Sequence, residues 1–196
     1  MGKVLVSTIY SVDSIIKTIT QESITDLYLI IDETKMPKDQ QEAIKKIKDT
    51  YSKIITIKEV KVPVYDILSI TKKCISLIDS IKTKPIVNIT PSRKTQAIGL
   101  LYACFKRSQN IDKIVYMAEE TQELIPLPLL DFELSDSQQT ILKNVDDGIT
   151  ITKLTTKSDL SRAMVYRILN TLKAKGLIQD SEEGWKITDS GRIALL

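Results

Sequence analysis

Short runs of β-branched and aliphatic residues alternate with longer stretches of helical periodicity over the first two thirds of the chain. Such alternation is typical of stacked βαβ units, which build a mostly parallel sheet. The runs predict strands at residues 4–9, 27–32, 54–59, 85–89 and 113–117. We therefore expect a three-layer, Rossmann-like α/β domain.

Amphipathic helices are predicted in the intervals between these runs. Pro37 opens one of them, because proline is favoured at the first helical position. A second covers about residues 66–81, with apolar side chains at steps of three and four, and a third follows Ile89.

The alternation stops near Pro126 and Pro128, since proline can neither continue a helix nor sit in a central strand. We place a domain boundary at about Phe132. Residues 1–132 then form the Rossmann-like domain and residues 133–196 a second, smaller one.

The second domain begins with a helix that Ser135 or Asp136 can cap. The elements expected after it are a helix at 151–157, a turn at 158–161, a helix at 162–175, and strands at 177–179 and 185–187. That order describes a winged helix-turn-helix, and it resembles the winged helices of many archaeal and bacterial regulators. The fold class is therefore α/β, with a C-terminal winged helix-turn-helix domain.

Histidine is absent from all 196 residues. Its absence excludes Ser-His-Asp and Cys-His catalysis, His-ligated zinc and histidine general bases. Cys74 and Cys104 lie in apolar helical stretches and form no Cys-x-x-Cys spacing. We expect two buried thiols, as in a reducing cytosol, with no metal site and no cofactor.

With 42% hydrophobic and 27% charged residues, the chain can bury a real core, and a net charge of +3 is too small to indicate a polyanionic partner by itself. No apolar run approaches the roughly 20 residues of a membrane span. Residues 1–3 lead directly into an apolar run, unlike the layout of a signal peptide. We expect a cytoplasmic protein without membrane contact.

The third helix of the second domain is basic and contains no acidic residue. A helix that enters the major groove needs cations toward phosphates and short polar or arginine side chains toward base edges. The residues expected to contact DNA are Ser161, Arg162, Tyr166, Arg167 and Lys173. The alternative is a solvated basic helix in a domain that binds only protein. The wing carries Asp180, Glu182 and Glu183, which repel phosphates, so we expect no DNA contact through it.

Two polar loops stand where open α/β sheets bind ligands, beyond the carboxyl ends of strands. One covers residues 7–11 after the first strand, and the other covers residues 88–95 after the fourth. Neither contains the glycines of a Walker A or Gly-x-Gly-x-x-Gly motif, which argues against triphosphate and NAD enzymes. The second loop groups hydroxyls and cations suited to a phosphodiester, on Thr90, Ser92, Arg93, Lys94 and Thr95.

Each loop also has a structural interpretation. Thr90 caps the following helix in one alternative, with Pro91 as its first residue and the basic pair in a solvated first turn. Cations at a helix N-terminus oppose its dipole, however, which favours a nearby anion. Tyr10 is equally compatible with a core or interface ring and with a ring that stacks on a base. Ser11 is equally a plain helix cap or a ligand residue.

The polar first loop, the Asn-Ile-Thr-x-Ser-x-Lys-Thr loop at residues 88–95 and the C-terminal winged helix together resemble the CRISPR-associated Rossmann-fold (CARF) regulators. The resemblance implies a homodimer with one pocket on its dyad for a cyclic oligoadenylate, with cyclic tetra-adenylate as the first candidate. It also implies winged helices that bind double-stranded DNA at CRISPR-locus promoters. The ligand residues that it implies are Tyr10, Ser11, Thr90, Ser92, Arg93, Lys94 and Thr95.

Three functions remain open. The first is a ligand-responsive transcription factor without catalytic residues, which the complete recognition helix favours. The second is a metal-independent ring nuclease, in which Lys94 stabilises the phosphorane and Ser11 positions the sugar while the 2′-hydroxyl attacks. The third is a constitutive DNA-binding protein whose α/β domain only dimerises.

Overall fold

The computed structural model describes residues 2–34, 36–130, 134–145, 148–182 and 184–195. The chain divides into two compact units, Met1–Leu127 and Pro128–Leu196. Each unit has a hydrophobic core of its own. The boundary expected at Phe132 lies outside the described residues.

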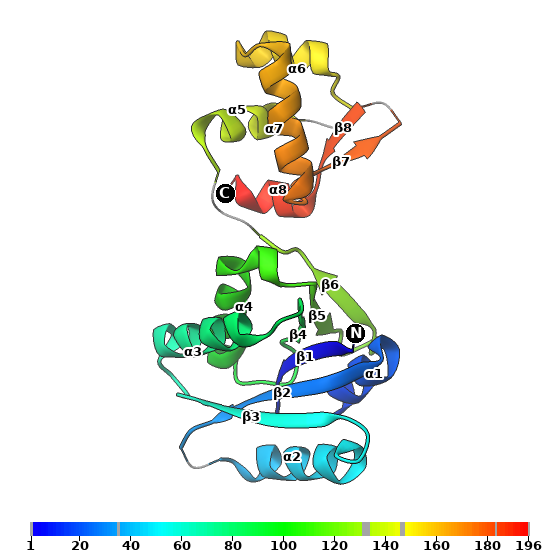
Figure 1. Ribbon diagram of the computed structural model, residues 1–196, viewed down its shortest axis with the longest axis vertical. Helices are drawn as coiled ribbons and strands as arrows, with labels where there is room; N and C mark the ends of the chain where they lie inside the picture. Colours follow the sequence, from blue (N-terminus) through cyan, green and yellow to red (C-terminus); the bar gives the residue numbers. More distant parts are fainter. Residues whose placement is uncertain (1, 35, 131–133, 146–147, 183, 196) are drawn as a thin grey trace. The chain divides into compact units, whose positions relative to one another are not determined.

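The first unit contains a six-stranded sheet with the order β3-β2-β1-β4-β5-β6 (Figure 1). Its strands are β1 (Lys3–Thr8), β2 (Ile24–Asp32), β3 (Thr56–Val62), β4 (Ile86–Asn88), β5 (Lys113–Met117) and β6 (Leu124–Leu127). The first five run parallel to one another, and β6 runs antiparallel to β5. The predicted Rossmann-like, mostly parallel sheet is therefore confirmed.

Strand β6 is not among the predicted strands, because the prolines at 126 and 128 predict the end of the α/β alternation there. Pro126 lies in this strand and pairs with Val115 of β5. An edge strand needs hydrogen bonds along one side only, so the missing N–H of a proline is tolerated. The sheet consequently continues to Leu127.

The helices of the first unit cover both faces of the sheet. They are α1 (Asp13–Glu22), α2 (Lys38–Tyr51), α3 (Ile67–Ser80) and α4 (Lys94–Lys106), with a short 3₁₀ helix, η1 (Ser108–Asn110). Helices α1 and α2 share one core with the sheet, and α3 and α4 pack against each other on the opposite face (Figure 1). Gly99 permits their close approach, because a Cβ there would lie 2.6 Å from Cγ2 of Ile70.

The second unit has the element order of a winged helix-turn-helix, as predicted. The elements are α5 (Asp136–Asn144), α6 (Ile151–Ser158), α7 (Arg162–Ala174), β7 (Ile178–Ser181), β8 (Gly184–Ile187) and α8 (Asp189–Ala194). Ser135 caps α5 in a reciprocal pair of hydrogen bonds with Gln138, so the cap is Ser135 and not Asp136. Helix α8 is an addition to the predicted elements.

The two cysteines are free and buried, as predicted, in α3 and α4. Burial raises the pKa of the Cys74 thiol to about 12, and burial likewise raises the pKa of Cys104. Since the thiolate is the reactive form, we expect both thiols to be unreactive in the folded chain.

We expect neither thiol to react with Ellman's reagent at pH 8 in the native protein, and both to react at once in about 6 M guanidinium chloride. The measurement is the absorbance of the released nitrothiobenzoate before and after denaturation. Rapid native labelling of either cysteine would contradict the packing of α3 against α4.

Candidate functional site

The carboxyl ends of the parallel strands bring the two predicted loops to one edge of the first unit. Strand β1 pairs with β2 on one side and with β4 on the other. The helices that follow β1 and β4 cover opposite faces of the sheet, so the chain order reverses between these two strands (Figure 1). Open α/β sheets bind ligands at such a reversal.

Tyr10 and Arg93 connect the two loops directly. The guanidinium carbon of Arg93 lies 5.4 Å from the centre of the Tyr10 ring, within the range of a cation–π interaction. It also lies 5.9 Å from the centre of the Tyr65 ring, in the loop between β3 and α3. Arg93 is therefore in contact with an aromatic ring from each of two other loops.

Asp32, at the end of β2, provides the buried charge of this site. Its side chain is 1% exposed. Gln96 Nε2 donates to Oδ1 at 2.7 Å, and Arg93 Nε donates to Oδ2 at 3.3 Å. Gln40 Nε2 lies 3.4 Å from Oδ1 as a further donor. A buried carboxylate requires such donors, because it has lost its hydration.

Gln40 extends this network to the first loop. Its Nε2 donates to the carbonyl oxygen of Ile9 at 3.1 Å, and its Oε1 accepts from the backbone N–H of Asp32 at 3.3 Å. The loops after β1, β2 and β4 are thus joined through one carboxylate and two glutamines.

The protonation states at this site follow from its burial and charges. Burial raises the pKa of Tyr10 and the charge of Asp32 raises it further, while Arg93 opposes them, so the pKa lies above its ordinary value. Partial burial lowers the pKa of Arg93, but Tyr10 and Asp32 outweigh it and raise the pKa overall. At neutral pH the site holds a neutral phenol and a cationic guanidinium.

The hydroxyls predicted to surround an anion hold the second loop in shape. All three bond to backbone groups: Met117 N donates to Thr90 Oγ1 (2.7 Å), Ser92 Oγ donates to the Arg93 oxygen (2.8 Å), and Thr95 Oγ1 donates to the Val64 oxygen (2.6 Å). Helix α4 begins at Lys94 after an Arg93 N-cap, so the alternative in which Thr90 caps the helix is wrong.

Ser11 and Lys94 are exposed and adjoin the Tyr10–Arg93 contact in the chain. Helix α1 begins at Asp13 after Val12, so Ser11 is not its cap. The structure thus leaves a hydroxyl and an ammonium group in solvent next to the residues that join the two loops.

Asn88, at the end of β4, ties the second loop to α1. Its Nδ2 donates to Thr18 Oγ1 at 3.0 Å and to the Ser14 oxygen at 3.2 Å, and its Oδ1 accepts from Thr90 N at 3.0 Å.

Close to these elements, Thr8 Oγ1, Ser14 Oγ and Gln96 Oε1 are buried without a hydrogen-bond partner among the described residues. Such unsatisfied polar atoms are rare in native structures.

Sequence reasoning missed Asp32, Gln40, Gln96 and Tyr65. An acidic residue that ends the apolar run Tyr28-Leu-Ile-Ile-Asp32 is the one signal that the sequence carried. The two glutamines are spaced as ordinary polar positions of amphipathic helices, and only the fold brings them to the carboxylate.

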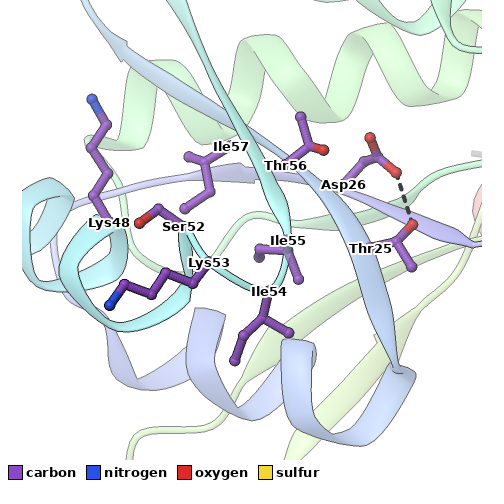
Figure 2. A pocket seen from close by; sticks show the side chains of 9 residues that line it. All are labelled: Thr25, Asp26, Lys48, Ser52, Lys53, Ile54, Ile55, Thr56 and Ile57. Atoms are coloured by element: carbon purple, nitrogen blue, oxygen red, sulfur yellow. Dashed lines mark hydrogen bonds between the residues drawn. The ribbon is translucent and has the colours of Figure 1, made fainter.

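A pocket of about 810 Å³ lies at the opposite, amino end of β2 and β3 (Figure 2). It is lined by Thr25, Asp26, Lys48, Ser52, Lys53, Ile54, Ile55, Thr56 and Ile57. Thr25 Oγ1 donates to Asp26 Oδ2 at 2.8 Å, and Lys48 is paired with Glu59 at 2.6 Å. None of the predicted ligand residues lines this pocket.

The second unit presents the start of α7 to solvent. Ser161 caps this helix, because its side chain accepts from Met164 N at 3.3 Å. Arg162, Tyr166 and Arg167 are exposed, while the apolar face of the helix packs into the core. The first turns of α7 thus have the exposure that was predicted for groove contact.

Lys173 differs from these residues. It forms an ion pair with Asp180 of β7, and its Nζ lies 5.7 Å from the centre of the Trp185 ring. The charge of Lys173 is therefore directed to the wing, at the far end of the helix from Arg162.

Two further properties of the described residues bear on the site. They include no group of three or more histidine, cysteine or acidic residues placed to hold a metal ion. None of the helices in this described part of the chain combines the length and the apolar composition of a membrane span.

Two family models match the chain. The model described as HFX_2341_N:-like, N-terminal matches residues 5–121, and the winged helix-turn-helix model HTH_45 matches residues 138–195. No curated protein matches the chain.

Three solved structures share the fold. Can2 from Sulfobacillus thermosulfidooxidans in complex with cyclic tetra-adenylate has a TM-score of 0.53 and 12% identity, over 98% of this chain and 63% of that chain. Protein VC1899 from Vibrio cholerae has a TM-score of 0.52 and 14% identity, over 98% and 64%. Enterococcus italicus Csm6 bound to cyclic hexa-2′-fluoro-hexa-dAMP has a TM-score of 0.55 and 11% identity, over 90% and 55%.

The chain thus spans less than two thirds of each of these proteins. At these identities the likeness concerns the fold. The expected architecture, a CARF-like domain followed by a winged helix-turn-helix, is confirmed.

The buried carboxylate yields a stability prediction for the first unit. Asp32→Ala removes the acceptor of the Gln96 amide and of Arg93 Nε, while the Gln40 amide keeps the Ile9 carbonyl oxygen. We expect it to lower the free energy of unfolding by about 2–5 kcal/mol. Urea unfolding followed by circular dichroism measures the loss.

Asp79→Ala is the matched control, since it removes an ion pair with Arg107 that lies on the surface. We expect a much smaller effect from it. Trp185, the only tryptophan, reports on the second unit, and its fluorescence transition should stay in place in both variants. Equal losses from both substitutions would contradict the role of Asp32.

Proposed function

Because the chain belongs to the HFX_2341_N:-like, N-terminal family over residues 5–121 and carries a winged helix-turn-helix, we propose that it is a CRISPR-associated transcriptional regulator. Its first domain binds a cyclic oligoadenylate and its second domain binds double-stranded DNA. The observation that carries the proposal is the meeting of the loops after β1 and β4 at Arg93, in a chain that also exposes a basic recognition helix.

The chemistry of the first site supports an anionic, base-containing ligand. Arg93 and Lys94 stand at the start of α4, where backbone N–H groups and the helix dipole favour negative charge. Tyr10 and Ser11 belong to the facing loop. Cyclic tetra-adenylate is the first candidate, and the Can2 structure was solved in complex with that molecule.

A homodimer gives this ligand a symmetric site. Leu68 of α3 and Ile98 and Tyr102 of α4 are exposed apolar residues on the outer side of the α3–α4 layer, and we infer that a second copy covers them. A cyclic ligand on the dyad then contacts both copies through the same residues. By favouring one relative orientation, it changes the spacing of the two recognition helices.

DNA recognition is assigned to the first turns of α7. Ser161, Arg162, Tyr166 and Arg167 supply phosphate and base-edge contacts, and the basic helix faces duplex DNA at CRISPR-locus promoters. Lys173 contributes less than was expected from the sequence, because it is paired with Asp180.

The test of ligand binding uses labelled cyclic tetra-adenylate in EDTA, with retention and integrity of the label as readouts. We expect retained, intact label, and at least a tenfold loss of affinity in Lys94→Ala, since a phosphate contact is removed. Lys45→Ala, an exposed lysine of α2, is the control that should bind as the wild type does.

Linear products would instead make the protein a ring nuclease, with Lys94 and Ser11 as the residues to replace next. If the wild-type chain neither retained nor cleaved the label, the ligand-responsive function would be wrong, and a constitutive DNA-binding protein would remain.

The salt dependence of DNA binding measures how much each cation of α7 contributes to binding phosphates. With a duplex of about 30 base pairs and random sequence, we expect Arg167→Ala to reduce the slope of log Kd against log[KCl] by about 1. Lys173→Ala should change it less, because its charge is already neutralised by Asp180. A larger change for Lys173 than for Arg167 would contradict this assignment.

A further inference from the structure

Tyr65 is an aromatic residue at the candidate site that neither polar loop contains. Tyr65 is 76% exposed and lies in the loop between β3 and α3. Single exposed aromatic residues are common on protein surfaces, so exposure alone does not indicate a ligand. What distinguishes Tyr65 is how firmly its neighbours are held and what its ring contacts.

The residues on both sides of Tyr65 are anchored. The carbonyl oxygen of Val64 accepts from Thr95 Oγ1 at 2.6 Å, which ties the loop to the start of α4. Asp66 caps α3 by accepting from Ser69 N at 3.0 Å. An exposed ring on such a fixed backbone loses little conformational freedom when a partner stacks on it.

The ring also stands beside a fixed cation. Arg93 lies 5.9 Å from its centre, and Arg93 is held in turn by the buried Asp32 and by the Tyr10 ring. An aromatic ring with most of its area in solvent can bind the base of a nucleotide, and a neighbouring guanidinium can bind its phosphate. Bases stack on aromatic side chains, and phosphates pair with arginine.

We propose that Tyr65 is a base-stacking residue of this site, on which a purine of the bound nucleotide stacks while Arg93 attracts the adjoining phosphate. This inference rests on the proposed function and adds a third loop to the two that the sequence indicated. Asp32 acts here as a positioning residue, because its ion pair with Arg93 holds the guanidinium near both rings.

Isothermal titration of the full-length protein with cyclic tetra-adenylate tests the proposal. Base stacking on an aromatic residue corresponds to about a 5- to 150-fold change in Kd, and we expect a loss of that size in Tyr65→Ala. Tyr65→Phe keeps the ring and should bind within about threefold of the wild type, since stacking needs no hydroxyl. Ile54→Ala is the matched control, because Ile54 is also 76% exposed but lies at the opposite edge of the sheet.

A cyclic tetra-adenylate with one 2-aminopurine reports stacking directly, because the fluorescence of that base is quenched when it stacks. We expect quenching with the wild type and Tyr65→Phe, and markedly less with Tyr65→Ala at saturating protein. Light scattering of each variant records the oligomeric state.

Each outcome decides a different claim. Wild-type binding together with unchanged affinity and quenching in Tyr65→Ala would overturn the stacking role and leave the proposed function standing. Weaker binding accompanied by a change of oligomeric state would make Tyr65 a subunit contact and overturn the inference. No binding by the wild type would overturn the proposed function and the inference with it.

Discussion

The candidate site depends on a single buried carboxylate and on the donors that surround it. Asp32 has almost no contact with solvent, so its charge must be balanced from within the fold. Three residues from two places in the chain donate to it: Gln40 of α2, and Arg93 and Gln96 at the start of α4. Gln40 also donates to the Ile9 carbonyl oxygen, so this network joins the loops after β1, β2 and β4.

The polar residues of the site have two different roles: some hold the loops in shape, and others stay accessible to a ligand. The hydroxyls of Thr90, Ser92 and Thr95 bond to backbone groups and so define the shape of the second loop. Lys94 is left in solvent, and Arg93 is only partly buried, with about a third of its side chain exposed. Arg93, which Asp32 holds in place, is the kind of fixed cation that recognition of a phosphodiester requires.

The sequence predicted the architecture because architecture depends on local patterns. Apolar runs and helical periodicity identified the five parallel strands, and capping and turn residues identified the winged helix. The sequence did not predict strand β6, because the edge position that tolerates Pro126 is a property of the folded sheet. The sequence also did not predict that Asp32 pairs with two glutamines. These lie 8 and 64 residues away in the chain, and no local pattern encodes the pairing.

Some features of the candidate sites could likewise be read from the sequence, and others depend on the folded structure. The sequence indicated the loops that hold Tyr10 and Arg93, since polar residues at strand ends are visible there, and the fold brings these two side chains together. It gave no indication that Lys173 would turn to the wing, because its pairing with Asp180 needs the helix and hairpin to be packed. The assignment of individual residues to ligand and DNA stays a prediction.

The central claim is that the loops at the carboxyl edge of the sheet, organised by Asp32, bind a cyclic oligoadenylate. Hydrogen–deuterium exchange of the full chain with and without cyclic tetra-adenylate tests it most directly. The account predicts slower exchange in residues 8–13, 63–66 and 89–96, with no change in residues 52–57, which line the pocket at the opposite edge. Protection confined to residues 52–57, or no protection in the first unit at all, would contradict it.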